Sequence, residues 1–572
     1  MCLSVNLSSS IIHLHFFIPC LSTQVTMMAL SLSSFFSTLV SILLLLQSTT
    51  HAARHNDWSK PCFHGECFYD LPAHSGKASG SLKIWGSLDA ITDITAAAGW
   101  TILGCSPDAL VQDIRLVCNS DDTGNSGCAH LHRKAGAVGK IVRLPENCGK
   151  SAFARISKAW VSKDQSIPKD VARRLVRRRG AQPQVHALAL DADFAAVDPA
   201  TNGEVSIAIQ GSTVPGAEGN LTVTPSSSRH DRRGPSSFID DAFNYFNSFD
   251  ESATKALPPV EVSKSFPFFS ESIPCDGPPA FNATMKADVD TNAHTVITLG
   301  VAAAGTIVPP KLTEFGLFTG MDGTFGGTLD FKGHVTAKVE TSVTFLQVGI
   351  LGLDFPGLLT IDPSFKILGQ VSATLDVNLE LKLDLSYTVN GAKLFFPPSP
   401  NHPSGGSFSS GNAPLKLSVS PSVASKTVVA AHLIPRFDVA ISALGGIAEA
   451  TFFVDFDASG FATLTLNAAA TGVGIDPATG AVSPSESASL DGCISAGTGL
   501  HVVAGADGSF FDLIDVSTEI PLFVVDFELF KKCFGVGTQK RAVSGHPELM
   551  PHRRELSMSC PVPSENPLVA VA

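Results

Sequence analysis

The sequence predicts a mainly β protein: an elongated antiparallel sheet or sandwich with long strands, preceded by a small, disulfide-rich, β-containing module. Apolar and polar residues alternate with a period of two over long stretches of the C-terminal half, which is the pattern of strands with one buried and one solvated face. These stretches follow one another without helical patterns between them, as in antiparallel sheets. Six of the twelve cysteines lie between Cys62 and Cys148, a density typical of small stapled domains.

Residues 1–53 are interpreted as a secretion signal. A serine-studded apolar run extends over Met27–Leu46, and Thr50–Ala52 suits cleavage after a small residue. Met27 or Met28 is an alternative translation start. We expect a mature chain that begins near Ala53, is secreted to the extracellular space or cell wall, and contains no transmembrane segment, because no later run of eighteen apolar residues occurs.

The mature chain keeps ten cysteines, an even number in a chain expected to reach an oxidising compartment, so we predict disulfides. We expect the first six to staple the N-terminal module and the other four to tie down the ends of a larger domain. Zinc is not predicted, because no CxxC pair occurs and His130-x-His132 stands alone. The disulfide candidates are Cys62, Cys67, Cys105, Cys118, Cys128, Cys148, Cys275, Cys493, Cys533 and Cys560, and fifteen pairings are open within the first six.

Composition divides the mature chain into four parts: a cysteine-rich N-terminal module (54–211), a linker with an amphipathic helix (212–274), a long-stranded β domain (275–535) and a tail (536–572). Within the module, the residues on either side of the turn-forming stretch 198–203 predict a hairpin of Val185–Val197 with Glu204–Ile209. The only helical pattern in the module surrounds Ser151–Val161.

The linker is rich in Ser, Pro and Gly up to Ser237, a candidate N-cap for a helix over Ile239–Ala256. Its apolar residues recur at helical spacing, and its polar face carries acidic residues such as Asp240 and Asp241. Because anionic headgroups repel such a face, we favour packing against a sheet over membrane binding.

Three long alternations define the β domain, over Met285–Val301, Leu329–Phe345 and Thr374–Val389. Sixteen residues in one strand span about 50 Å, more than twice the usual length. Turn formers at Asp457–Gly460 separate shorter strands, and Pro397–Pro414 is predicted to be a long mobile loop. The apolar strand face either packs against a second sheet, which we favour, or carries an apolar, lipid-like ligand.

All four tryptophans lie in the N-terminal module. Exposed Trp rings commonly stack on sugars, so a glycan site, if the protein has one, belongs to this module. Trp85 and Trp100 are the candidate ligand-binding residues. The alternative, which we prefer, is that both lie in the core of the module.

Other features define the remaining sites and partners. Asn220 and Asn282 begin N-x-T sequons and are glycosylation candidates. The formal charge of −12 argues against nucleic acid as a partner. The basic cluster Arg173–Arg179 is interpreted as a processing site or solvated surface rather than a polyanion site, and Lys540-Arg541 and Arg553-Arg554 resemble processing sites too.

No nucleophile elbow, H-E-x-x-H motif, phosphate loop or dinucleotide fingerprint occurs in the sequence. We therefore predict no catalytic residue, no cofactor and no metal, and lean towards a protein that is not an enzyme.

The segments Ser79–Ser87 (SGSLKIWGS), Ala98–Cys105 (AGWTILGC), Lys140–Cys148 (KIVRLPENC) and Pro356–Phe365 (PGLLTIDPSF) resemble uncharacterised secreted proteins of filamentous, basidiomycete-type fungi. The resemblance spans most of the mature chain and implies a fungal extracellular or cell-wall setting, without an established activity. The leading hypothesis is a non-enzymatic cell-surface or wall protein that acts by binding or structure. The alternatives are a carrier of apolar ligands on the long sheet and an extracellular hydrolase of polysaccharide or ester.

Overall fold

The computed structural model describes most of the chain after residue 55. The described residues are 56, 58–71, 78–120, 126–175, 183–214, 236–248, 257–276, 280–375, 379–411, 415–419, 425–466, 474–475, 482–483, 492–509, 518–534, 555–560 and 569–570. The predicted signal segment, Asn220 and the paired basic sites near the C-terminus lie outside them. None of the described helices is both long and apolar enough to cross a membrane.

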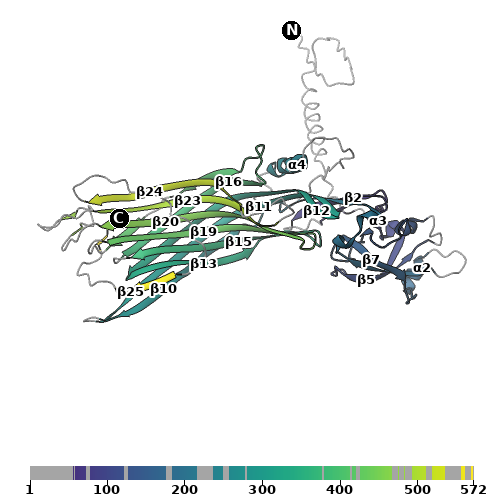
Figure 1. Cartoon of the computed structure of the whole chain (residues 1–572), viewed down its shortest axis with the longest axis horizontal. Helices are drawn as coiled ribbons and strands as arrows, with labels where there is room; N and C mark the ends of the chain where they lie inside the picture. Colours follow the sequence, from purple (N-terminus) through teal and green to yellow (C-terminus); the bar gives the residue numbers. More distant parts are fainter. Residues whose placement is uncertain are drawn as a thin grey trace, which may run out of the picture. The chain divides into compact units, whose positions relative to one another are not determined.

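Two large antiparallel sheets pack face to face around one core, which confirms the predicted fold class (Figure 1). The first sheet runs β1 (Glu66–Asp70), β2 (Ser79–Gly86), β9 (Val205–Ser212), β11 (Phe281–Val308), β12 (Pro310–His334), β16 (Leu379–Phe396), β18 (Leu415–Val419) and β26 (Val569–Ala570), with β10 (Val260–Cys275) beside β11 and β17 (Gly405–Ser410) beside β16. The second runs β24 (Thr518–Phe534), β23 (Gly492–Ser509), β20 (Ala448–Leu466), β19 (Ser425–Ala443), β15 (Leu359–Leu375), β13 (Thr336–Gly349) and β25 (Glu555–Ser559), with β14 (Leu353–Phe355) beside β15.

Only the first of the three long alternations forms a single strand. It lies within β11, which has 28 residues. The second passes from β12 to β13 through the buried Val335, and the third passes from β15 to β16, so each is divided between the two sheets. The prediction of three unbroken strands was therefore wrong for two of them. A chain that crosses from one sheet of a sandwich to the other keeps the same side towards the core, so its alternation shows no break.

Phenylalanine side chains fill the space between the sheets. Phe325 of β12 stacks on Phe456 of β20 at 5.7 Å between ring centroids, and Phe315 stacks on Phe452 at 5.5 Å. The hydroxyl of Tyr387 in β16 lies 2.7 Å from Thr498 Oγ1 and 3.1 Å from the carbonyl oxygen of Gly499, both in β23. The space beside these rings measures only about 10 Å³, no more than one water needs. Along this part of the sandwich, the apolar strand faces bury one another.

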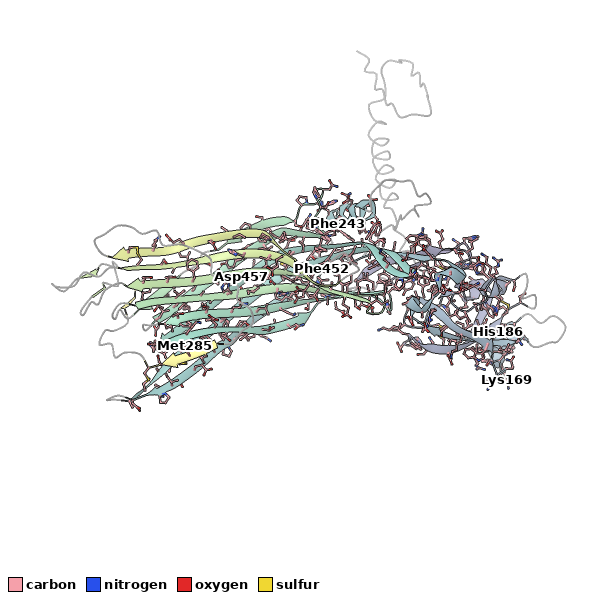
Figure 2. All side chains as sticks on the ribbon, in the orientation of Figure 1. Lys169, His186, Phe243, Met285, Phe452 and Asp457 are labelled. Carbon is pink, nitrogen blue, oxygen red and sulfur yellow. A yellow bond between two sulfur atoms is a disulfide. The ribbon has the colours of Figure 1, made fainter. Side chains whose placement is uncertain are left out.

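Helix α4 (Ser236–Asn247) covers the outer face of the first sheet, as predicted for the linker helix. Phe243 and Phe246 are about 1% exposed and pack on Phe318 and Phe395. Phe243 is labelled in Figure 2. Two glycines make room for the helix: a Cβ at Gly300 would lie 2.7 Å from the ring of Phe246, and one at Gly316 would lie equally close to Ile239. The helix therefore docks through shape complementarity with the strands beneath it.

The N-terminal module adds a third sheet of six strands. Its order is β3 (Ile91–Asp93), β6 (Ile141–Arg143), β7 (Phe153–Val161), β8 (Val185–Asp191), β5 (Gln112–Cys118) and β4 (Trp100–Gly104), and only the β3–β6 pair is parallel. Its helical elements are η1 (Ala96–Ala98), η2 (Gly127–His132), α2 (Lys169–Arg174), η3 (Phe194–Ala196) and α3 (Pro199–Asn202). A two-stranded sheet of β21 (Gly474–Ile475) and β22 (Val482–Ser483) completes the described elements.

The structure corrects two sequence predictions within the module. The predicted hairpin does not form, because β8 pairs with β5 and β7 while β9 pairs with β2 and β11. Phe194 and Val197 are buried between them, which anchors the connection in the core and redirects the chain. The predicted helix around Ser151–Val161 is strand β7. A bulge between Ile156 and Lys158 shifts the alternation so that it imitates helical spacing.

Three further corrections concern the β domain. The predicted linker contains β10, an edge strand. Its sequence did not indicate a strand because Pro267 and Pro274 are unfavourable in the interior of a sheet. The predicted loop Pro397–Pro414 contains β17, paired with β16. The predicted turn Asp457–Gly460 lies within β20. Only glycine fits at position 460, because the Leu383 side chain approaches it across the core. A Cβ there would lie 2.1 Å from Leu383 Cδ2.

Candidate functional site

The two tryptophans predicted from the sequence do not offer an open platform. Trp100 is 2% exposed in the core of the module, with its ring edge-on to His132 and His186. Trp85 is half-buried on β2, where it packs beside Ala208 and Ala304. The interpretation that we preferred, packing in the core of the module, holds for Trp100, whereas Trp85 lies on the first large sheet, outside that core.

Trp160 of β7 is the tryptophan that sequence reasoning missed as a candidate. Its side chain is 39% exposed. Trp160 pairs with Ala187 of β8, which in turn pairs with Arg115 of β5. Residues paired in register point to the same face of a sheet, so these three form one row on the outer face of the module.

A second row lies beside the first on the same face. Lys158, Ala189 and Asp113 are aligned across the same three strands, and Lys158 and Asp113 are exposed. Between the outer strands, which lie about 10 Å apart, Ala189 is half-buried and Ala187 is 3% exposed. We call this surface the Trp160 face: Trp160, Lys158, Ala187, Ala189, Asp113 and Arg115.

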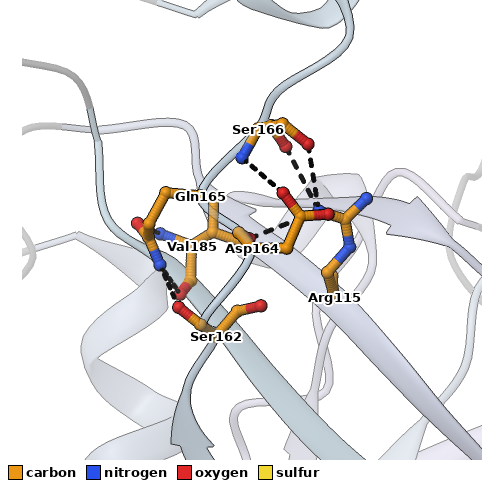
Figure 3. Close-up of polar contacts among 6 residues, drawn as sticks. All are labelled: Arg115, Ser162, Asp164, Gln165, Ser166 and Val185. Carbon is orange, nitrogen blue, oxygen red and sulfur yellow. Dashed lines mark hydrogen bonds and ion pairs between the residues drawn. The ribbon is translucent and has the colours of Figure 1, made fainter.

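Arg115 is held in place at one end of the Trp160 face (Figure 3). Its Nη1 donates to Asp164 Oδ2 at 2.5 Å and to the carbonyl oxygen of Ser166 at 3.3 Å. The Ser166 amide donates to Asp164 Oδ1 at 3.0 Å. Hydrogen bonds from Ser166, reinforced by the charge of Arg115, hold the pKa of Asp164 below its usual range. Arg115 and Asp164 therefore present a fixed cation and anion, with 30% and 59% of their side chains exposed.

The loop that carries Asp164 is itself anchored to the sheet. The Gln165 side chain acts as a short extra strand (Figure 3): its Nε2 donates to the carbonyl oxygens of Ser162 and Val185, and its Oε1 accepts from the Val185 amide. Beyond the loop, Val171 of α2 packs over Val117 on the same face of the sheet. This end of the Trp160 face is consequently rigid.

An ion pair borders the other end. Arg155 Nε and Nη2 donate to both carboxylate oxygens of Asp191, at 2.7 and 2.6 Å. This bidentate pair neutralises itself. Within the Trp160 face and its border, Lys158 and Arg115 stand against Asp113 and Asp164, so the surface carries hydrogen-bonding groups of both signs. The neighbouring α2 adds Lys169, Arg173 and Arg174 against Asp170.

All ten predicted cysteines are paired. The module holds Cys62–Cys67, Cys105–Cys148 and Cys118–Cys128, whereas Cys275–Cys560 and Cys493–Cys533 belong to the sandwich. Cys105–Cys148 and Cys118–Cys128 tie the loops of the module that presents Trp160. Asn282 is exposed on β11. Across the described residues, no cluster of three or more His, Cys, Asp or Glu side chains could hold a metal ion.

The outer face of the second sheet holds a group of side chains that resembles catalytic machinery. His432 Nδ1 lies 2.8 Å from Asp457 Oδ1, and Ser459 is the cross-strand partner of His432. All three are buried, with exposures of 5%, 1% and 0%. A substrate cannot reach a nucleophile without exposed surface, so we interpret this group as a structural polar network (Asp457 is labelled in Figure 2).

No protein-family model, curated protein or solved structure matches this chain.

Proposed function

We propose that this protein is a secreted, non-enzymatic protein of the cell surface or wall that binds neutral glycans through the Trp160 face. The observation that carries the proposal is an exposed tryptophan on the outer face of a sheet, beside a fixed cation and a fixed anion.

The chemistry of the surface suits a sugar. The apolar face of a pyranose ring stacks on an indole, which supplies a large and rigid apolar contact area. Sugar hydroxyls both donate and accept hydrogen bonds, so they match Arg115 and Lys158 as donors and Asp113 and Asp164 as acceptors.

The carboxylates select among extracellular ligands. A polyanion would be repelled by Asp113 on the Trp160 face and by Asp164 beside it. A neutral polysaccharide meets no such penalty. The disulfide-rich module and the exposed sequon residue Asn282 are consistent with the extracellular setting in which such polymers occur.

Binding to insoluble polysaccharides tests the proposal. The full-length protein is incubated with β-1,3-glucan, chitin, mannan and, as the anionic comparator, polygalacturonate, and the free protein is measured after sedimentation. We expect saturable binding to at least one neutral polymer, weaker binding to polygalacturonate, and at least a tenfold loss of affinity in Trp160→Ala.

Val161→Ala provides a matched control. Val161 is the next residue of β7, is 50% exposed and points to the opposite face of the sheet, so its truncation should leave binding unchanged. Equal binding by wild type and Trp160→Ala, or binding only to polygalacturonate, would contradict the proposal.

A further inference from the structure

A pocket of about 420 Å³ opens where the end of β16 faces the second sheet. One wall is formed by Phe396 and by the loop that follows it, and the other by Phe452 of β20 and by Leu522 of β24. This volume lies within the range of small-molecule sites, roughly 300–1,000 Å³. The pocket contrasts with the middle of the sandwich, where about 10 Å³ is left beside the stacked rings.

The pocket has a buried floor and an exposed rim. Phe452 and Ala504 at its floor are 2% and 5% exposed. Pro398, Pro400 and Pro521 at its rim are exposed. Proline fixes its backbone φ near −65°, so the rim is restricted before any ligand arrives, and less conformational entropy is lost when one binds.

The walls present no fixed charge. Among the described residues that line the pocket, none is Asp, Glu, Lys or Arg, and only Ser399, His402 and Ser404 carry polar side chains. The Ser404 hydroxyl already accepts from the Phe395 amide at 2.9 Å. His402 packs its ring against Phe395 and against Phe243 of α4. An ionised ligand group would therefore lose its hydration without gaining a counter-ion.

The aromatic geometry fits a hydrocarbon ligand. Phe396 and Phe452 meet edge to face, with ring centroids 4.6 Å apart, and so present both a ring face and a ring edge to the pocket. We propose that this pocket binds an uncharged, predominantly hydrocarbon small molecule, which enters between the proline rim and β24. This site is separate from the Trp160 face, and neither proposal depends on the other.

Fluorescence titration with the uncharged probe N-phenyl-1-naphthylamine tests the site on the full-length protein. We expect saturable enhancement with one site per chain. The variant Leu522→Trp adds bulk at the pocket wall and should weaken probe binding at least tenfold. Val524→Trp is the matched control, because Val524 lies on the same strand, is 56% exposed and does not line the pocket.

A second measurement needs no variant. Dodecanol and dodecanoate share a chain but differ in charge at pH 8, and we expect dodecanol to displace the probe at a concentration at least tenfold lower. Circular dichroism checks that the variants remain folded. Absence of saturable probe binding, equal weakening by the two tryptophan variants, or displacement by dodecanoate as readily as by dodecanol would overturn the proposal.

Discussion

Replacement of Asp455 by Asn should change how the stability of the sandwich depends on pH. Asp455 lies in the middle of β20 and is 8% exposed. Its Oδ2 accepts from Arg436 Nη1 at 3.3 Å, whereas Oδ1 has no hydrogen-bond partner. Burial raises the pKa of Asp455 to about 7. The positive charge of Arg436 lowers this pKa, and the nearby carboxylates of Asp438 and Asp457 raise it.

The size of the change in unfolding free energy follows from the difference between the pKa of Asp455 in the folded and in the unfolded protein. An unfolded Asp titrates near pH 3.9, so the pKa difference is about 3 units, and each unit corresponds to 1.36 kcal/mol. Because the folded state keeps this proton to higher pH than the unfolded state, the stabilisation is complete below about pH 4 and is lost as the pH rises to about 7. The contribution of Asp455 to the free energy of unfolding should therefore fall by about 4 kcal/mol over this range.

Urea unfolding followed by far-ultraviolet circular dichroism at pH 4, 5, 6, 7 and 8 measures the free energy of unfolding as a function of pH. Asparagine cannot ionise, so Asp455→Asn should gain stability relative to wild type as the pH rises, by at least about 2 kcal/mol between pH 4 and pH 8. Asp362→Asn, an exposed position on β15, serves as control and should follow the wild type. Parallel curves for wild type and Asp455→Asn would refute the reasoning.

Three other changes should report on packing and cross-linking. Phe246→Ala removes a ring of α4 that is 1% exposed and should lower the free energy of unfolding by about 3–5 kcal/mol. We expect α4 to lose hydrogen-exchange protection; unchanged protection would show that this contact does not hold the helix. Tyr387→Phe removes the hydroxyl that reaches Thr498 and should cost about 1–2 kcal/mol in urea unfolding, whereas an unaltered midpoint would argue against the cross-sheet bond. The double variant Cys275→Ser/Cys560→Ser opens a link across 285 residues and should lower stability by roughly 5 kcal/mol or less; an unchanged stability of the non-reduced protein would contradict a structural role.

Local sequence patterns predicted the strands better than they predicted how the strands are connected. Alternation located β11, β12 and β16 because burial of one face dictates it. It did not reveal that Val335 lies between strands of different sheets, since both strands face the same core. Asp457–Gly460 was predicted to be a turn because Asp and Gly are common in turns. In the structure, Asp457 contacts His432 and Gly460 leaves room for the Leu383 side chain, and both lie within a strand.

The candidate site depended on information that one sequence does not contain. Composition placed any glycan site in the tryptophan-bearing module, but only the fold separates the buried Trp100 from the exposed Trp160. The bulge in β7 concealed the strand that carries Trp160. The neighbouring Arg115 and Asp164 are 49 residues apart. They meet because β8 pairs with both β5 and β7 and because Gln165 anchors the loop after β7. One signal in the sequence could have indicated an exposed position for Trp160. It lies at the end of Phe153–Val161, where the pattern changes from apolar to polar residues.

Oxidation of Trp160 by N-bromosuccinimide tests the central claim most directly. The extent of oxidation at each tryptophan is measured by peptide mass spectrometry, with and without a saturating oligosaccharide of the neutral polymer that binds best. We predict that the sugar slows oxidation of Trp160 at least tenfold and leaves the half-buried Trp58 and Trp85 unchanged. Oxidation of Trp160 at the same rate with bound sugar would contradict its role as the binding platform.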